Sequence, residues 1–416
     1  MVHKYSELDL MQARIKEVPN GWSFFPIAKT FKIRNDLRKP ISDEIRCTQQ
    51  GTYPYYGPTK IQDYIDTYEQ DGSFALIGED GDHFLKYKSQ SMTQLVDGKC
   101  TVNNHAHIIE GTKTASREWF YYYFMHRDIY SYLSRQGAGR YKLNKASLEK
   151  IYVLIPPSEE QNKIVQILST WDQAILATEK LLENSQQQKK ALMQQLLTGK
   201  KRLLDEAGVS FSEEWKEYPL GNLGNTFTGL TGKTKEDFGS GVPYITYMNI
   251  FKNNRIDINQ VDYVIVTEDE NQNSVRYGDI FFTTSSETAE EVGMSSVLLE
   301  EVERLYLNSF CFGFRLNNFK ILLPQFAAYI LRSSNIRKQI SILGQGATRY
   351  NLSKNQLMKL ILRLPTIAEQ KKIAEVLFTA DQEIEILQKK LECLKQKKKA
   401  LMQQLLTGKK RVKVAA

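Results

Sequence analysis

Two stretches of the chain carry apolar residues at alternating steps of four and three, which gives a period of 3.5 residues. The pattern continues over more than four heptads in each stretch and is typical of a coiled-coil helix. In the first stretch these positions are Ile164, Leu168, Trp171, Ile175, Thr178, Leu182, Ser185, Lys189, Leu192 and Leu196. In the second they are Ile373, Leu377, Ala380, Ile384, Leu387, Leu391, Leu394, Lys398, Leu401 and Leu405. We therefore expect two long amphipathic helices, each with one apolar seam.

Capping residues predict where both helices begin and end. Capping-box spacing is found for Ser158 with Gln161 and for Thr366 with Glu369. Gly199 and Gly408 follow the last seam residues, and glycine is the residue that most often closes a helix. Each helix is then about 40 residues long, or roughly 60 Å at 1.5 Å per residue.

A single amphipathic helix cannot bury its seam alone, so each one needs a partner. Each helix could pack on its own domain or form a homodimer. We favour pairing between the two, because both belong to one chain and meet at high effective concentration. The pattern leaves the orientation open, and we favour the antiparallel one. Lys189 and Lys398 then lie near opposite ends of the pair.

The two stretches belong to a long internal repeat. The sequence KKALMQQLLTGKKR occurs at residues 189–202 and again at 398–411, an offset of 209 residues. Over residues 136–202 the same offset gives 37 identities in 67 positions without a gap. A repeat of this length indicates one structural unit that is used twice.

The segments between the repeats diverge and read as mixed strands and loops. Both open with a tryptophan followed four residues later by proline, as Trp22 with Pro26 and Trp215 with Pro219. Both are expected to close on a helix, at residues 119–134 and 324–341. We interpret the aromatic residues of these helices as core. One scaffold that holds two different segments favours a protein that binds two different targets at a set spacing, as half-sites on duplex DNA require.

Composition fits a globular protein, with 41% apolar and 25% charged residues. The net charge is +8, and basic residues without any acid run from Lys395 to Lys413. This run is either a solvated helix end or a contact for a polyanion such as nucleic acid. Scattered cysteines, the absence of an apolar run of about 18 residues and a charged N-terminal segment together predict a cytoplasmic protein without a membrane span.

Motifs that resemble enzyme sites are incomplete. GLTGKT at 229–234 lacks the glycine that a phosphate-binding loop needs, because Phe227 stands there. His105 and His107 lack the further ligands of a metal site, which favours structural or base-contacting roles. A self-contained nuclease or methyltransferase would need catalytic motifs that we do not find, so we expect no catalytic residue and no metal in this chain.

Several segments together resemble one family. They are YPYYGPTKIQDYIDTYEQDGSFALIGEDGD (53–82), VNNHAHII (102–109), YITYMNIF (244–251), GDIFFTTSSETAEEVGMSSVLL (278–299) and YLNSFCFGFRL (306–316), with PPSEEQNKIVQIL and LLTGKK of the repeat. The chain resembles the specificity subunit of type I restriction–modification systems over essentially its whole length.

The resemblance implies an α+β fold. Two mixed α/β target recognition domains are joined by two long helices, which form an antiparallel intramolecular coiled coil with pseudo-two-fold symmetry. The expected bounds are 1–157 for the first domain, 158–199 for the first spacer, 200–215 for a linker, 216–365 for the second domain, 366–408 for the second spacer and 409–416 for a basic tail.

The resemblance also implies a function. Each domain reads one half of a bipartite asymmetric site on double-stranded DNA, and the coiled coil sets the gap. Two modification subunits and the restriction subunits are the implied partners. They carry S-adenosylmethionine, ATP and Mg²⁺, and this chain binds no cofactor. The alternative is a coiled-coil assembly protein that binds two protein partners.

Candidate DNA contacts come from the polar loops of the two divergent segments. In the first half they are Tyr55, Tyr56, Lys60, Gln62, Lys86, Lys88, Gln90 and Asn104. In the second half they are Thr231, Lys233, Lys235, Tyr247, Asn249, Ser285 and Ser286. For Tyr55 and Tyr56, strand packing is an equally good interpretation. Arg140 and Arg349 are equivalent in the repeat, which argues against a role in reading two different half-sites.

Overall fold

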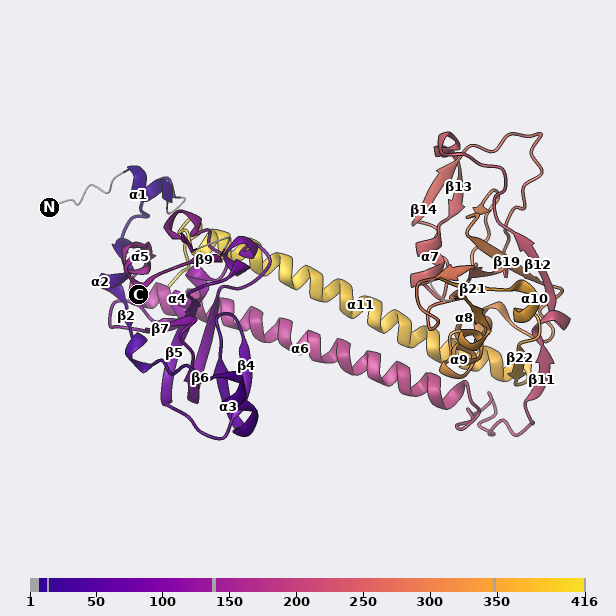
Figure 1. Cartoon of the computed structure of the whole chain (residues 1–416), viewed down its shortest axis with the longest axis horizontal. Coiled ribbons are helices and arrows are strands. Elements are labelled where there is room, and N and C mark those ends of the chain that lie inside the picture. The colour runs from indigo at the N-terminus through magenta and orange to yellow at the C-terminus, as the bar shows by residue number, and fades with distance from the viewer. Residues whose placement is uncertain (1–6, 13–14, 137–139, 347–348, 415–416) are drawn as a thin grey trace. The chain divides into compact units, whose positions relative to one another are not determined.

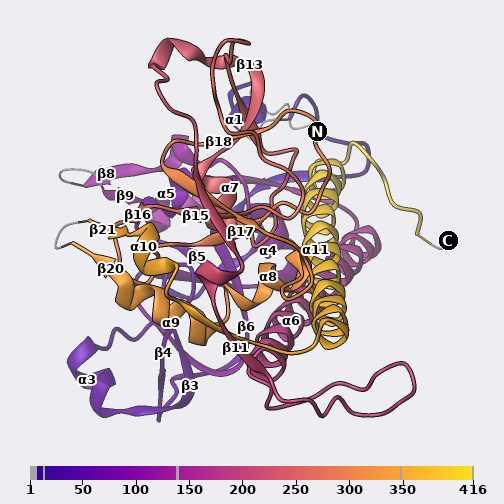
Figure 2. The same ribbon diagram turned by 90° about the vertical axis from the view of Figure 1, so that its right-hand side faces the viewer.

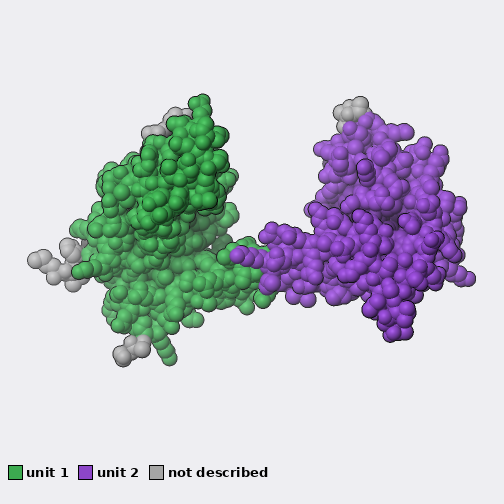
Figure 3. Space-filling view, turned by 90° about the horizontal axis from the view of Figure 1, so that it is seen from below, with its two compact units in different colours: residues 1–179, 390–416 green, residues 180–389 purple. Residues whose placement is uncertain are grey.

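The computed structural model describes residues 7–12, 15–136, 140–346 and 349–414, and the chain divides into two compact units (Figure 1). Unit 1 comprises residues 1–179 and 390–416, and unit 2 comprises residues 180–389 (Figure 3). The two long helices, α6 (Ser158–Leu196) and α11 (Ile367–Leu405), contribute to both units. Each unit therefore contains one globular domain, the start of one long helix and the end of the other.

The domain of unit 1 is built on a six-stranded sheet in the order β2-β7-β5-β6-β3-β4. These strands are β2 (Lys32–Ile33), β3 (Gln50–Tyr56), β4 (Ile61–Ile65), β5 (Gln70–Gly78), β6 (Thr93–Val102) and β7 (Ala106–Glu110). Two-stranded ladders join β1 (Ser23–Pro26) to β10 (Tyr152–Ile155) and β8 (Ser134–Gln136) to β9 (Arg140–Lys142). The helices are α1 (Glu7–Gln12), α2 (Ile27–Thr30), α3 (Asp43–Thr48), α4 (Arg117–Phe124) and α5 (Lys145–Lys150).

The domain of unit 2 divides its strands among smaller sheets, ordered β12-β19-β15-β17, β14-β13-β18, β16-β21-β20 and β11-β22. Figure 2 shows β16, β21 and β20 side by side. The strands are β11 (Lys216–Pro219), β12 (Gly224–Thr228), β13 (Phe238–Ile245), β14 (Val261–Val264), β15 (Ile280–Thr283), β16 (Ser285–Ser286), β17 (Ser295–Val297), β18 (Tyr306–Leu307), β19 (Cys311–Leu316), β20 (Gly344–Gln345), β21 (Tyr350–Leu352) and β22 (Ile361–Leu364). The helices are α7 (Tyr247–Lys252), α8 (Pro324–Ile330), α9 (Ser334–Leu343) and α10 (Lys354–Leu357).

The expected closing helices are shorter than the sequence pattern indicated. The helix expected over residues 119–134 ends at Phe124, and Asp128 then accepts a hydrogen bond from the Tyr130 backbone in a local turn. The helix expected over 324–341 is two helices, because Ser333 caps the start of a new one. Most aromatic residues of the expected helices are core, as predicted: Trp119, Phe120, Tyr122, Tyr123, Phe124, Phe326 and Tyr329 are buried, whereas Tyr121 and Tyr132 are half-buried and Tyr130 is 51% exposed.

The two long helices pair in antiparallel orientation within unit 1. The ion pairs there join Lys398 to Asp172 and Lys395 to Glu179. Residue numbers therefore rise along α6 as they fall along α11. Every predicted seam position is buried or half-buried in both helices, which confirms the heptad pattern.

Unit 2 repeats this pairing with the two copies exchanged. Lys189 of α6 pairs with Asp381 of α11, and Ser185 Oγ donates to Glu383 Oε1 at 3.1 Å. The predicted antiparallel orientation is therefore confirmed in both units. Lys189 and Lys398 each contact an aspartate of the other helix and not one another.

The helix ends close as predicted, but neither predicted capping box forms in full: Thr366 Oγ1 accepts from the Glu369 backbone N–H at 3.4 Å, and α6 already includes Ser158. Gly199 and Gly408 both adopt φ of +70°, the left-handed conformation that glycine tolerates best. Gln161 instead accepts from the Ser116 backbone N–H at 2.7 Å, and the Glu369 carboxylate is held by Arg202. These side chains therefore fix the start of α6 to the first domain and the start of α11 to the segment that follows α6.

Candidate nucleic-acid interface

A three-residue turn of unit 1, turn 103–105, connects β6 to β7 and presents polar side chains. The buried Asn103 donates its backbone N–H to Tyr56 O at 3.0 Å, and its Oδ1 accepts from the His105 N–H at 2.8 Å. His105 O accepts in turn from the Glu79 N–H at 2.7 Å. The backbone of the turn is thus fixed on several sides, while Asn104 is exposed at its tip.

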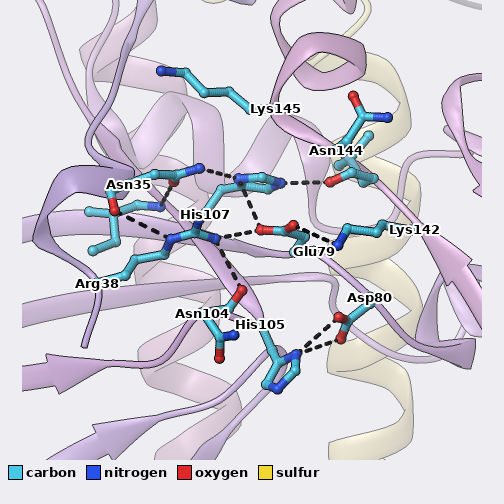
Figure 4. Close-up of polar contacts among 12 residues, drawn as sticks. Asn35, Arg38, Glu79, Asp80, Asn104, His105, His107, Lys142, Asn144 and Lys145 are labelled. Carbon is cyan, nitrogen blue, oxygen red and sulfur yellow. Dashed lines mark hydrogen bonds and ion pairs between the residues drawn. The ribbon is translucent and has the colours of Figure 1, made fainter. Parts of the chain in front are cut away.

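A charged cluster centred on Glu79 supports this turn (Figure 4). Glu79, whose side chain is 12% exposed, forms ion pairs with Arg38 and with Lys142. Arg38 Nη1 also donates to Asn104 O at 3.0 Å. Burial alone would raise the pKa of Glu79, but the hydrogen bond from Arg38 and the neighbouring positive charges lower it below its ordinary value. Arg38 therefore links a fixed carboxylate to the tip of the turn.

Two histidines, His105 and His107, belong to the same region as the turn. The buried His107 places Nε2 2.7 Å from Leu143 O and Nδ1 2.9 Å from the Asn35 amide nitrogen, so its role is structural. Burial lowers the pKa of His107 below its ordinary value. His105 differs, because its side chain is 45% exposed and its Nδ1 lies 3.0 Å from the Asp80 carboxylate.

The structure brings three of the predicted contacts of the first half together around this turn. Lys60 lies between β3 and β4, Gln62 lies in β4, and the Gln62 Oε1 accepts from the Asn103 Nδ2 at 2.8 Å. Lys60, Gln62 and Asn104 are all exposed. The hydrogen bond between Asn103 and Gln62, which are 41 residues apart in sequence, thus joins the turn and the start of β4 into one polar surface.

The other predicted residues of the first half have different surroundings. Tyr55 is 1% exposed, with its hydroxyl 2.9 Å from the Ile41 backbone N–H, so packing occupies its side chain. Tyr56 is half-buried, and burial raises the pKa of its phenol. Lys86, Lys88 and Gln90 are exposed on the segment between β5 and β6 and remain predictions.

Unit 2 contains a turn with the same construction, turn 308–310, between β18 and β19. Asn308 donates its backbone N–H to Ile245 O at 3.0 Å, and its Oδ1 accepts from the Phe310 N–H at 2.8 Å. Phe310 O accepts from the Thr284 N–H at 3.2 Å. Each of these bonds has its counterpart at turn 103–105.

The strands beneath the two turns also correspond. β3 runs parallel to β6 with Tyr56 opposite Val102, and β13 runs parallel to β18 with Ile245 opposite Leu307. The carbonyl of Glu79 accepts from Leu143 N–H at 2.7 Å, and that of Thr284 accepts from Leu352 N–H at 2.8 Å. Leu143 and Leu352 are equivalent in the 209-residue repeat. The two domains therefore share one frame in the region where their sequences diverge.

A pocket of about 420 Å³ lies beside turn 308–310. Its lining includes Asn308, Ser309 and Phe310 of the turn together with Lys235 and Tyr244. Phe310 is 69% exposed, which is unusual for a large aromatic side chain. The pocket thus combines an exposed aromatic ring with a cation.

The predicted residues near this pocket fall into two groups. Thr231 and Lys235 are exposed, and the Thr231 backbone N–H donates to the Gln272 side chain at 3.1 Å. Lys233 also lines the pocket, but its side chain is 6% exposed and its Nζ lies 2.5 Å from the Glu270 carboxylate. Its charge is therefore neutralised within the domain.

The last predicted group lies around α7. Tyr247 is half-buried, and its hydroxyl donates to Ser285 O at 2.8 Å. Asn249 is 2% exposed and bonds the backbone at Asp257, so its role in this conformation is structural. Ser286 is buried and Ser285 half-buried. The sequence placed these side chains in polar loops, where no pattern distinguishes an inward amide from an outward one.

Several functional candidates were absent from the sequence prediction. Ser309 and Phe310 lie in YLNSFCFGFRL, but their counterparts are found at an offset of 205 residues (308 − 103), not at the 209 of the repeat. A gapped comparison anchored on VNNH and LNSF would have aligned them. Arg38 lies outside the segments that carry the resemblance and Glu79 lies within one, and only the folded chain shows that the two side chains meet.

The basic run at 395–413 is partly used inside unit 1. Lys395, Lys398 and Arg411 pair with acidic residues of α6. In the part of the chain that the structure describes, no group of three potential metal ligands gathers, and no helix is long and apolar enough to cross a membrane.

These features define a class of protein in which one repeated helical scaffold carries two variant domains. The model of the type I restriction modification DNA specificity domain matches residues 19–185 and 212–396, so the chain belongs to this family. A putative type I restriction enzyme specificity subunit of Methanocaldococcus jannaschii is 26% identical over 98% of both chains. One from Haemophilus influenzae is 37% identical over 143 residues, which span 34% of this chain and 35% of that relative.

The crystal structure of a type I restriction–modification S subunit from M. genitalium has the same fold, with a TM-score of 0.61 and 16% identity over 97% of this chain and 99% of that one. The predicted fold class is thereby confirmed. Family membership assigns the chain to the DNA-specificity role, which is separate from the catalytic activities of the complex, and does not favour a general coiled-coil assembly protein.

Proposed function

We propose that each domain of this chain reads one half of a bipartite asymmetric site on double-stranded DNA. The observation that carries the proposal is the shared frame beneath turns 103–105 and 308–310, which is the same in both domains while the exposed residues differ. A backbone frame that both domains share is expected if both domains bind the same kind of ligand, duplex DNA. Different exposed residues suit two different base sequences.

The paired helices set the distance between the two half-sites in this proposal. Each helix has 39 residues and rises about 58 Å at 1.5 Å per residue, well over one turn of duplex. A change in helix length by whole turns is expected to change the length of the nonspecific gap and leave both half-sites as they are.

Two modification subunits are the proposed partners at the repeated helix ends. The ion pairs of Glu160 with Arg411 and of Glu369 with Arg202 are equivalent in the two units and support equivalent docking at these ends. Restriction subunits complete the proposed complex. S-adenosylmethionine, ATP and Mg²⁺ belong to these partners in the proposal, and this chain supplies DNA specificity without a bound cofactor. The cytoplasmic location expected from the sequence stays a prediction.

The first experiment measures DNA binding by the chain assembled with its modification subunits. Methylated bases are mapped to identify the site, and affinity is then compared for that duplex and a scrambled duplex over a range of salt concentrations. We expect strong preference for the mapped site and a log-linear loss of affinity with salt. Equal affinity for both duplexes would contradict the proposal.

A second experiment exchanges residues 216–344 for the matching segment of another family member. One half of the mapped site is expected to change and the other half to stay. A change in both halves would show that the domains do not read independently.

A further inference from the structure

Turns 103–105 and 308–310 occupy equivalent places on a shared frame but differ in their exposed residues. Asn103 and Asn308 are both asparagine and make the same hydrogen bonds through the backbone N–H and the side-chain Oδ1, so they hold the turn. The next two residues are Asn104 and His105 in unit 1 and Ser309 and Phe310 in unit 2. We propose that these two pairs are equivalent specificity-determining positions, each of which contacts base edges of its own half-site. This assignment rests on the proposed function.

The contrast within each turn supports this assignment. Residues that read two different half-sites must share a location and differ in identity, whereas residues that hold the frame must stay alike. Arg140 and Arg349 share a location but do not differ in identity, because both are arginine. The positions after Asn103 and Asn308 meet both conditions, and they are exposed.

Asn104 has the chemistry to recognise adenine. A carboxamide offers one donor and one acceptor, which match the N7 acceptor and the N6 donor of adenine in the major groove. Within the described residues its carboxamide makes no hydrogen bond, and Figure 4 shows it directed away from the Glu79 cluster. Its backbone carbonyl, in contrast, is held by Arg38 at 3.0 Å. A fixed backbone with a free amide loses little entropy when it meets a base edge.

Phe310 has a different chemistry, which suits thymine. An exposed aromatic ring makes apolar contact with the C5-methyl group that only thymine carries. Phe310 is 69% exposed, and Ser309 beside it offers a hydroxyl group. Lys235 lines the same pocket and can neutralise a nearby phosphate. The second half-site should therefore contain a thymine whose methyl group contributes to binding.

Base analogues test both assignments on the assembled complex and the mapped site. Replacing one adenine of the first half-site with 7-deazaadenine removes N7, one of the two hydrogen-bonding atoms of that contact, and should weaken binding by about 2- to 13-fold. In the Asn104→Ala variant the same analogue should cause no further loss. Replacing a thymine of the second half-site with deoxyuridine should weaken binding to the unaltered chain but not to the Phe310→Ala variant.

A turn exchange provides the control within one molecule. Asn104→Ser with His105→Phe should alter base preference in the first half-site alone, and Ser309→Asn with Phe310→His in the second alone. The untouched half-site reports that the chain is folded and assembled. Unchanged preference in both exchanges, or analogue effects that persist in the alanine variants, would overturn the turn assignment and leave the proposed function in place. A complex without preference for any bipartite site would overturn the proposed function itself, and the turn assignment with it.

Discussion

The Lys398 ammonium group of α11 pairs with the Asp172 carboxylate of α6, although the two residues are 226 positions apart in the sequence. Lys398 is 8% exposed and also lies 5.5 Å from the Tyr122 ring. The Tyr122 hydroxyl donates to the second oxygen of Asp172 at 2.8 Å. A buried cation therefore depends on one carboxylate that is itself oriented by the domain.

Asp172→Asn should lower the free energy of unfolding of unit 1. Loss of one partner from a fully buried pair costs about 3–5 kcal/mol, and we expect about 2 kcal/mol because the Asp172 side chain is 36% exposed. Hydrogen exchange of residues 390–405 measures the effect in the full chain. Glu385→Gln is the control, because its pair with Lys389 is exposed and should contribute less than about 0.5 kcal/mol. Equal effects of the two variants would contradict the prediction.

Arg202 and Arg411 are equivalent in the repeat, but they should differ in how strongly each stabilises the start of a long helix. Arg411 binds Glu160, which also accepts from Trp22 Nε1 at 3.0 Å. Arg202 binds Glu369, whose side chain is 0% exposed. Arg202→Ala therefore leaves a buried carboxylate without its cation, and we expect it to cost about 3 kcal/mol. Arg411→Ala should cost about half as much, because the tryptophan donor remains.

Hydrogen exchange at the first turn of each long helix, residues 158–164 and 367–373, compares the two variants. Glu369→Gln added to Arg202→Ala should recover most of the loss, because it removes the unpaired charge. A larger effect for Arg411→Ala, or no recovery by Glu369→Gln, would show that charge burial is not the cause.

The sequence predicted the two long helices far better than the surface that is proposed to contact DNA. Heptads and capping glycines are local patterns, and an exact repeat shows that they are used twice. The heptad pattern places Lys398 in the seam but does not identify Asp172 as its partner. Which acidic residue lies opposite depends on the register between two helices that are far apart in sequence. Tyr55 and Asn249 show the same limit. Both have polar side-chain atoms that hydrogen-bond backbone groups in the folded chain, and the sequence alone does not distinguish them from side chains that are free to contact a ligand.

The turns were missed for a different reason. Their frame depends on parallel pairing between strands that are far apart in sequence, and the offset between the halves changes from 209 to 205 residues there. Asn104 was predicted from its type alone. Its equivalence to Ser309 follows only from the hydrogen bonds of the asparagines that precede them.

Acidification should destabilise the first domain through His83. Burial lowers the pKa of His83 from 6.5 to about 4, so the folded state prefers the neutral ring. As the pH falls from about 6.5 to 4, the unfolded chain gains a proton that the folded chain does not. Stability is therefore lost over this window, by about 3 kcal/mol for a shift of this size.

His83→Leu should remove this part of the pH dependence. Hydrogen exchange of residues 82–90 at pH 7 and pH 5 in both proteins provides the measurement, and the difference between the two proteins separates His83 from the carboxylates that also titrate. The same pH dependence in both proteins would show that His83 is not responsible.

Lys235 and Lys233 should contribute differently to DNA binding, although both line the pocket beside turn 308–310. Lys235 is exposed, whereas Lys233 is paired with Glu270 and lowers the pKa of that carboxyl group to about 2. If Lys235 neutralises one phosphate, Lys235→Ala should reduce the slope of log affinity against log salt concentration by about 0.9. Lys233→Ala should leave the slope unchanged, because its charge is already balanced within the domain. Binding of the mapped duplex by the assembled complex, titrated at several salt concentrations, gives both slopes. A reduced slope for Lys233→Ala alone would mean that the Glu270 pair opens when DNA binds.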